Sequence, residues 1–245
     1  MAKLIAGGDS FVYGSELKGP AFPELVAREL SWEYQNTAVA GHSNGGISRH
    51  IINACAESDS DLVMVCWTFL GRYEFYINGK FRTVTPWSAD ENLEQTITEQ
   101  FVNEDDSVRS HHIKQHREAQ ESGLHEFAQS YYRYVGDSEY TEVYNTLLHI
   151  VRTQQYLKAH NRKYVFTAVH ENVLGHATKH LDDPSIRSLY KEVDLNHWFW
   201  FPKQLGFYTW AQDRKFPFAT THPLDPAHQE ASKLLHQKIL TSSFG

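Results

Sequence analysis

The segment "KLIAGGDSFVYGSEL", residues 3–17, contains the first indications of the fold. A short apolar run meets Gly-Gly-Asp-Ser directly, and an aromatic segment with a third glycine follows. A short apolar run bounded by glycine is typical of a buried β-strand that ends in a turn. Ser10 would then lie at a strand end, either as an activated nucleophile or, with Asp9, as part of a cap on the next element.

Further apolar runs and amphipathic segments alternate along the rest of the chain. The runs are short, rich in Val, Ile and aromatic residues and bounded by Gly, Asp or Asn, which favours buried parallel strands. We expect strands at residues 3–7, 34–40, 61–67 and 163–169, and helices at residues 22–30, 43–58, 139–161 and 225–240. Alternating strands and helices predict one α/β domain over residues 1–245, with a central, mostly parallel sheet covered on both faces.

The stretch from Gly71 to about Gly136 interrupts this alternation. It begins with aromatic residues around "INGK", which predicts a hairpin turn, and then becomes acidic and polar. A segment this long inside a compact domain is usually a lid or a binding insertion, and we expect one at about residues 71–136. A second aromatic segment, "NHWFWFPKQLGFYTW" (residues 196–210), either packs in the core or lines a substrate site.

Composition argues against two classes of partner. The net charge is −7 with the histidines neutral, and the sequence has no Lys/Arg-rich stripe, so we expect no nucleic-acid partner. No run approaches the ~18 consecutive apolar residues of a membrane-spanning helix, and "MAKLIAGGDS" has too short an apolar stretch for a signal peptide. We therefore expect no membrane partner and a cytoplasmic location.

The cysteines and histidines indicate neither a disulfide framework nor a metal centre. Cys55 and Cys66 lie in apolar surroundings and match no metal motif, so we expect two buried free thiols. In "HHIKQH", His112 and His116 could share a helical face and bind a metal, but with His111 they fit solvated surface residues better. The sequence also lacks a P-loop and a G-x-G-x-x-G motif, and we expect no cofactor and no metal.

Three blocks, in order along the chain, resemble those of the SGNH (GDSL-like) hydrolase family. They are "GGDS" after the first expected strand, "NTAVAGHSN" (36–44) after the second, and "THPLDPAHQEASKLL" (221–235) at the last helix. The resemblance implies the family's flavodoxin-like, three-layer α/β/α fold. It also implies that Ser10 is the catalytic nucleophile, that His222 is the base, and that the backbone N–H groups of Ser10 and Gly41 bind the oxyanion.

Two positions depart from the family pattern. The family's third block supplies an asparagine to the oxyanion hole, but "CWTFLGRYEF" contains none. Thr68 is the nearest hydroxyl there, and Asn44 is a second candidate unless it caps its helix. The family's aspartate stands three residues before the histidine, where this chain has Ala219.

Three substitutes for the missing acid remain open. Asp213 could reach back from the preceding loop, or a backbone carbonyl could orient the His222 imidazole. The pair could instead be Asp225 and His228, although Asp225 followed by proline is favoured as a helix cap.

These features predict a serine-dependent ester hydrolase, of the esterase, deacylase or lipase-like kind, that uses a Ser10–His222 pair. We expect a small-molecule, carbohydrate or lipid ester as substrate, and the sequence leaves the oligomeric state open. Aromatic residues suited to stacking on sugars or holding acyl chains are Phe69, Tyr73, Phe75, Tyr76, Trp198, Phe199 and Trp200. The alternative is a catalytically impaired relative that serves as a binding or assembly module. The missing acid and asparagine favour that alternative, and such degraded middle blocks resemble those of some proteins encoded by tailed phages.

Overall fold

The computed structural model describes residues 1–100 and 106–241, and within them four parallel strands form the main sheet. The strands are β1 (Lys3–Gly7), β2 (Glu33–Asn36), β3 (Leu62–Trp67) and β6 (Tyr164–Ala168), in the order β2-β1-β3-β6. The chain passes from β1 to β2 on one side and then crosses to β3 on the other. In parallel sheets, the crevice beyond the carboxyl ends of the strands at such a reversal is where ligands bind. The segments that follow β1 and β3 therefore frame the expected site.

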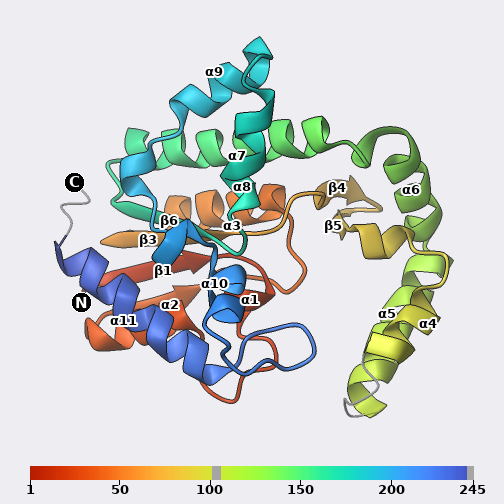
Figure 1. Cartoon of the computed structure of the whole chain (residues 1–245), viewed down its shortest axis with the longest axis horizontal. Coiled ribbons are helices and arrows are strands. Elements are labelled where there is room, and N and C mark those ends of the chain that lie inside the picture. Colours follow the sequence, from red (N-terminus) through yellow and green to blue (C-terminus); the bar gives the residue numbers. More distant parts are fainter. Residues whose placement is uncertain (101–105, 242–245) are drawn as a thin grey trace.

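Alternate residues of each strand point to opposite faces of this sheet, and helices cover the apolar side chains on both faces. Leu4 and Ala6 pack in the core shared with α2 (Phe22–Glu29) and α11 (Asp225–Thr241). Ile5 packs in the core shared with α3 (Asn44–Glu57) and α7 (Glu139–Ala159). Figure 1 shows the two helix pairs on opposite sides of the sheet. The three-layer α/β/α fold predicted from the sequence is thereby confirmed.

The predicted strands and long helices are present with one notable difference in length. The second strand was expected at residues 34–40, but β2 ends at Asn36. The Asn36 side chain accepts a hydrogen bond from the Ala38 N–H at 2.9 Å and donates one to the Val12 carbonyl at 3.2 Å. Local side-chain bonds of this kind replace the strand ladder and begin a turn. Cys55 and Cys66 are buried and free, as expected.

Short elements lie between β1 and α2 and between β6 and α11. They are α1 (Ser10–Tyr13), α8 (Asn172–Gly175), η3 (His176–His180), α9 (Pro184–Glu192), η4 (Leu195–His197), η5 (Pro202–Gln204) and α10 (Phe207–Asp213). In the second aromatic segment, Trp198, Phe201, Phe207 and Trp210 are buried, so core packing accounts for these four rings.

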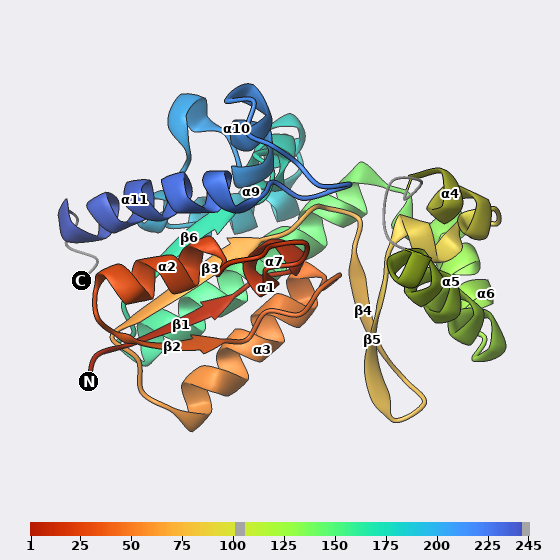
Figure 2. The same ribbon diagram turned by 90° about the horizontal axis from the view of Figure 1, so that it is seen from below.

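In the described part of residues 71–136, where an insertion was expected, the chain forms a hairpin and a group of helices. Strand β4 (Tyr73–Ile77) pairs antiparallel with β5 (Lys80–Val84) around Asn78 and Gly79, which both have positive φ, so the predicted hairpin turn is confirmed. The helices that follow are η1 (Pro86–Ala89), α4 (Leu93–Gln100), α5 (Asp106–Glu121), α6 (Leu124–Tyr131) and the π-helix η2 (Tyr132–Gly136). Figure 2 shows these elements standing to one side of the sheet. Whether they act as a lid stays a prediction.

Helix α5 escaped the sequence analysis because it is polar along nearly its whole length. Its residue Ile113 packs on Leu93 and Ile97 of α4, and such sparse burial leaves no apolar periodicity to recognise. His111, His112 and His116 belong to α5, but their side chains lie outside the described part of the structure. Across the described ranges, no helix combines the length and apolarity needed to cross a membrane.

Candidate active site

Ser10 lies directly beyond β1, as the first residue of α1. The sharp turn into this helix needs glycine at position 8, because a Cβ there would lie 2.5 Å from Cγ2 of Val12. Asp9 caps the helix, since its Oδ1 accepts a hydrogen bond from the Phe11 N–H at 3.2 Å. Asp9 therefore provides the cap, and the Ser10 hydroxyl is engaged elsewhere.

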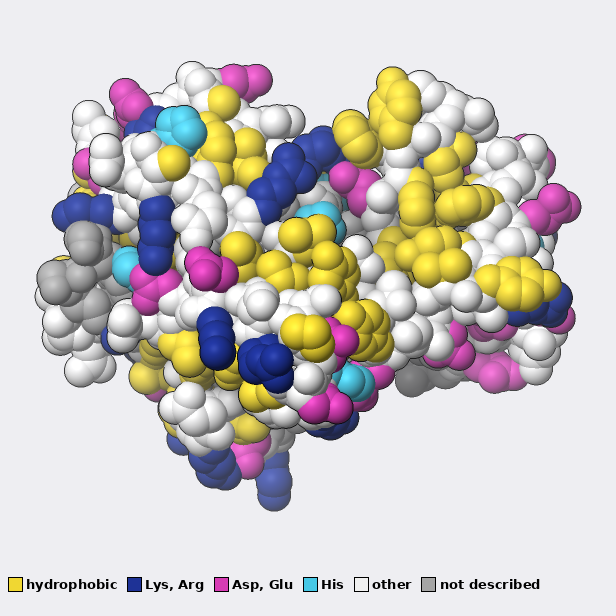
Figure 3. Space-filling view, turned by 90° about the horizontal axis from the view of Figure 1, so that it is seen from above, with side chains coloured by type: hydrophobic (Ala, Val, Ile, Leu, Met, Phe, Trp, Pro, Cys, Tyr) yellow, Lys and Arg dark blue, Asp and Glu magenta, His cyan; other side chains and the backbone are white. Residues whose placement is uncertain are grey.

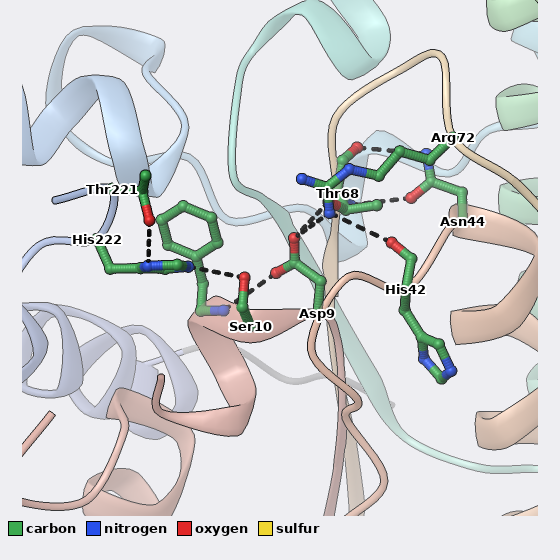
Figure 4. A network of polar contacts seen from close by, with 9 residues as sticks. Asp9, Ser10, His42, Asn44, Thr68, Arg72, Thr221 and His222 are labelled. Carbon is green, nitrogen blue, oxygen red and sulfur yellow. Dashed lines mark hydrogen bonds and ion pairs between the residues drawn. The ribbon is translucent and has the colours of Figure 1, made fainter. Parts of the chain in front are cut away.

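That hydroxyl meets a histidine from the other end of the chain. The distance between Ser10 Oγ and His222 Nε2 is 2.7 Å, although 212 residues separate the two positions. The Phe11 ring packs against the imidazole, with 4.6 Å between the ring centroids. Figure 4 shows the imidazole directed at the serine. The geometry is that of a nucleophile in hydrogen-bond reach of its base.

A carboxylate that the sequence analysis missed completes the arrangement. Glu16 Oε2 lies 2.8 Å from Nδ1 of His222 and accepts backbone N–H bonds from His222 at 3.1 Å and Thr221 at 3.4 Å. Burial alone would raise the pKa of the Glu16 carboxyl. The side-chain hydrogen bond from His222, the charge of His222 and the two backbone hydrogen bonds together outweigh burial, so the pKa of Glu16 is lowered. Glu16 is therefore ionised at neutral pH.

An ionised Glu16 decides which nitrogen of His222 carries the proton. A carboxylate can only accept hydrogen bonds, so Nδ1 must donate, which leaves the lone pair of Nε2 facing the Ser10 hydroxyl. The Thr221 hydroxyl also lies 2.8 Å from Nδ1 and can share this proton. The tautomer is the one that a general base needs.

Glu16 reaches His222 through an unusual turn. It follows Gly14, whose φ is +89°, and itself has a φ of +65°. A non-glycine residue in this left-handed region costs roughly 1–2 kcal/mol, and such positions concentrate at functional sites. Glu16 is the sole acid between Asp9 and Pro20, which is the signal that sequence reasoning could have used.

The two acids proposed from the sequence, Asp213 and Asp225, bind other partners than His222. Both oxygens of Asp213 lie 2.7 Å from Nζ of Lys203. Asp225 accepts the Gly19 N–H at 2.7 Å and so ties the segment after Glu16 to the start of α11. A carboxylate rather than a backbone carbonyl faces Nδ1 of His222, so the three substitutes proposed for the missing acid were wrong.

His228 cannot replace His222 as the base in this arrangement. Its side chain is buried, and its Nδ1 accepts a hydrogen bond from the Phe22 N–H at 3.1 Å. Burial lowers the pKa of His228 to about 4, so the ring is neutral and structural.

The expected oxyanion donors fall into two groups. Gly41 lies in the exposed loop between β2 and α3 with a φ of +79°, and no atom lies within 4 Å of where a Cβ would be. Asn44, in contrast, is buried and does not cap α3, because Ser43 does. Its Nδ2 donates to the Thr68 carbonyl at 3.3 Å and to Thr146 Oγ1 at 3.2 Å, and its Oδ1 accepts the Thr68 N–H at 2.9 Å. The Asn44 amide therefore fixes the end of β3.

Thr68 belongs to a buried polar network beside Ser10. Its hydroxyl lies 2.5 Å from Asp9 Oδ2, and Arg72 Nη1 lies 3.0 Å from the same oxygen and 3.1 Å from Thr68 Oγ1. The same Nη1 lies 3.4 Å from the His42 carbonyl. Figure 4 shows these contacts converging on Asp9. Arg72 was not singled out from the sequence.

A groove of about 590 Å³ opens between the β2–α3 loop and the insertion. Gly41 and His42 line it on one side, and Phe81 and Trp87 line it on the other. Figure 3 shows hydrophobic side chains gathered over the insertion, at the right of that view. The volume falls in the range of small-molecule sites, about 300–1,000 Å³. The groove shares Gly41 with the candidate oxyanion site.

None of the seven aromatic residues expected to line a substrate site belongs to the described lining of this groove. Trp198 and Tyr73 are buried, while Tyr76 is exposed on the hairpin. Phe69 packs on Phe11, 6.0 Å between centroids, and so lies close to the candidate catalytic residues. Among described side chains, no three His, Cys, Asp or Glu gather closely enough to hold a metal ion.

Comparison with known proteins identifies the fold. No family model and no curated protein matches the sequence. The esterase EstA from Pseudoalteromonas sp., solved with monoethylphosphonate as inhibitor, matches 98% of this chain and 97% of its own, with a TM-score of 0.52 and 10% identity. A lipolytic G-D-S-L family protein from Veillonella parvula has a lower TM-score of 0.42, at 12% identity, and the match covers 99% of this chain and 98% of its own. The lipase Lip_vut3 from a goat rumen metagenome has a TM-score of 0.43, at 11% identity, and the match covers all of both chains. The chain has the α/β fold of the SGNH (GDSL-like) hydrolases.

Proposed function

We propose that this protein is a serine-dependent ester hydrolase. The observation that supports the proposal is the chain of hydrogen bonds from Ser10 Oγ through both ring nitrogens of His222 to Glu16. A nucleophile, a base in the correct tautomer and a carboxylate that orients the base are what acyl transfer at serine requires. The fold, shared with an esterase, agrees with it.

In the proposed reaction, Ser10 Oγ attacks the ester carbonyl carbon while its proton passes to His222 Nε2. The carbonyl oxygen becomes negatively charged, and the backbone N–H groups of Ser10 and Gly41 stabilise it. Collapse of this intermediate breaks the bond to the alcohol, which leaves with the proton from Nε2. Water then attacks the acyl-enzyme and gives a proton to His222 Nε2. The bond from the acyl carbon to Ser10 Oγ breaks, Nε2 returns the proton to Oγ, and the acid product leaves. Glu16 stays ionised throughout and stabilises the imidazolium, and no step needs a cofactor.

The groove beside Gly41 is the proposed place for the part of the substrate that does not react. Its lining combines the Arg49–Glu74 ion pair, 2.8 Å between Nη2 and Oε1, with the rings of Phe81 and Trp87. A small-molecule, carbohydrate or lipid ester would each meet polar and apolar groups there. The ester that is hydrolysed is therefore best found with a panel of substrates.

The alternative, a catalytically impaired binding or assembly module, loses its main support. It rested on the acid missing at Ala219, and Glu16 now occupies the position of that acid relative to His222. The lack of the third-block asparagine remains the observation in its favour.

Hydrolysis of p-nitrophenyl esters by wild type, Ser10→Ala, His222→Ala and Ser15→Ala tests the proposal. We expect Ser10→Ala and His222→Ala to lower kcat by at least 10³-fold. Ser15 belongs to the same turn but not to the proposed machinery, so Ser15→Ala should keep wild-type kcat. Folded wild type that hydrolyses no ester in the panel, or a Ser10→Ala variant as active as wild type, would refute the proposal.

A further inference from the structure

Arg72 joins three segments that meet at the candidate active site. Its Nη1 contacts Asp9 after β1 at 3.0 Å, Thr68 after β3 at 3.1 Å, and the carbonyl of His42 in the β2–α3 loop at 3.4 Å. Its CZ atom lies 5.2 Å from the centroid of Phe69, and its side chain is 20% exposed. One guanidinium group thus links the turn that carries Ser10 with the loop that carries Gly41 (Figure 4).

The two side chains proposed as oxyanion donors, Thr68 and Asn44, have no donor to spare. A threonine hydroxyl has one proton, and that of Thr68 goes to Asp9, whose carboxylate accepts it at 2.5 Å. Asn44 directs its amide N–H groups to the Thr68 carbonyl and to Thr146. Within the described structure, both side chains therefore serve the scaffold rather than an oxyanion.

The charge of Asp9 makes the position of Arg72 important. Asp9 is fully buried and directly precedes Ser10, where negative charge develops on the substrate oxygen during acyl transfer. An unbalanced carboxylate buried at this position would oppose that charge, because burial lowers the effective dielectric constant. The guanidinium balances Asp9 and adds a fixed positive charge beside the nucleophile.

We propose that Arg72 is a positioning residue for the oxyanion site. By binding Asp9 and the His42 carbonyl together, it holds the N–H groups of Ser10 and Gly41 in register so that both meet the same oxygen. Lysine would keep the charge, but its ammonium group stands on a more flexible stem and lacks the rigid, planar geometry that fixes Nη1 of Arg72 among its three acceptors. This inference rests on the proposed esterase function.

The test compares kcat, KM, melting temperature and the rate of reaction with a fluorophosphonate for Arg72→Lys and Arg72→Met. Because Arg72 acts on the transition state, we expect kcat to fall about tenfold in Arg72→Lys and about 100-fold in Arg72→Met, with KM within threefold. The rate of phosphonate labelling should fall in parallel, since labelling also develops negative charge on oxygen. Arg162→Met is the matched control: Arg162 is 17% exposed and pairs with Asp59 at 2.7 Å. It should lose stability at most and keep wild-type kcat.

Removal of Arg72 alone leaves Asp9 buried and unpaired, which can unfold the protein. The double variant Asp9→Asn/Arg72→Met removes both charges, and its kcat should remain at least 30-fold below that of wild type. A kcat within threefold of wild type in folded Arg72→Lys, Arg72→Met or the double variant would overturn the inference. So would an equal loss of kcat in Arg162→Met. If wild type neither hydrolyses esters nor reacts with the phosphonate, the proposed function itself fails, whatever the variants show.

Discussion

Replacement of Glu16 by glutamine removes the negative charge next to His222 and leaves Ser10 and His222 themselves unchanged. The carboxamide has nearly the same size, and its oxygen can still accept the backbone N–H bonds of Thr221 and His222. What is lost is the negative charge opposite the imidazolium that forms when Ser10 gives up its proton. The change therefore separates the electrostatic role of Glu16 from its structural role.

The size of the effect follows from the 2.8 Å distance between Glu16 Oε2 and His222 Nδ1. This contact places the two charge centres about 4 Å apart, where an effective dielectric constant of about 20 gives an attraction of about 4 kcal/mol. An energy of this size corresponds to about 10³ in rate. The Asp→Asn change in the serine-protease triad, where a wrong tautomer contributes as well, lowers kcat by about 10⁴. We expect kcat for Glu16→Gln to fall between about 10³- and 10⁴-fold.

The assay is release of p-nitrophenol from the best ester of the panel, with kcat and KM determined separately. KM should stay within a fewfold of wild type, because Glu16 lies behind the imidazole rather than against the substrate. Asp213→Asn is the control, since Asp213 binds Lys203 instead of His222. A folded Glu16→Gln variant with kcat within tenfold of wild type, or a larger loss in Asp213→Asn, would refute the assignment of Glu16.

Three further predictions concern the backbone, the buried histidine and the thiols. Gly41→Ala should lower kcat 10- to 100-fold and cost roughly 1–2 kcal/mol in the free energy of unfolding, because φ is +79° and a Cβ there strains the backbone that positions the N–H group. Wild-type kcat and stability would contradict this strain argument. His228 has a folded pKa of about 4 against an ordinary value of 6.5, so the unfolded chain binds its proton first and stability falls as the pH drops from about 6.5 to 4. This loss of stability is on the order of 3 kcal/mol. Urea unfolding at several pH values should show a smaller loss over the same pH range for His228→Asn than for wild type. An equal pH dependence of the two proteins would contradict this role of His228. Burial raises the pKa of the Cys55 thiol to about 11 and that of Cys66 well above its ordinary range, so neither should react with DTNB at pH 8 before the protein unfolds.

The part of the fold that sequence could predict is the part with strong hydrophobic patterning. The runs around Ile5, Met64 and Phe166 are strands buried at every position except Lys3, and glycines or polar residues mark their ends clearly. Ser10 and His222 could be paired in advance because their blocks resemble the first and last blocks of the SGNH (GDSL-like) hydrolases, and a parallel sheet brings the ends of its strands to one edge. The structure brings these two side chains together.

Glu16 and the helices of the insertion lay beyond the reach of sequence patterns. Glu16 approaches His222 only because the chain turns through left-handed conformations at Gly14 and Glu16 itself, and the contact spans 206 residues. No local propensity encodes such a contact. Helix α5 lacks an apolar stripe, so its polar sequence resembles a loop. Arg72 likewise gains its importance from three contacts that exist only after β1 and β3 pair.

The residue to which a fluorophosphonate becomes covalently attached, identified by mass spectrometry of the digested protein, decides whether Ser10 is the nucleophile. We expect a single adduct, on Ser10, that forms in wild type, forms much more slowly in Glu16→Gln, and is absent in Ser10→Ala. Folded wild-type protein that stays unmodified, or that carries its adduct on another residue, would contradict this role of Ser10.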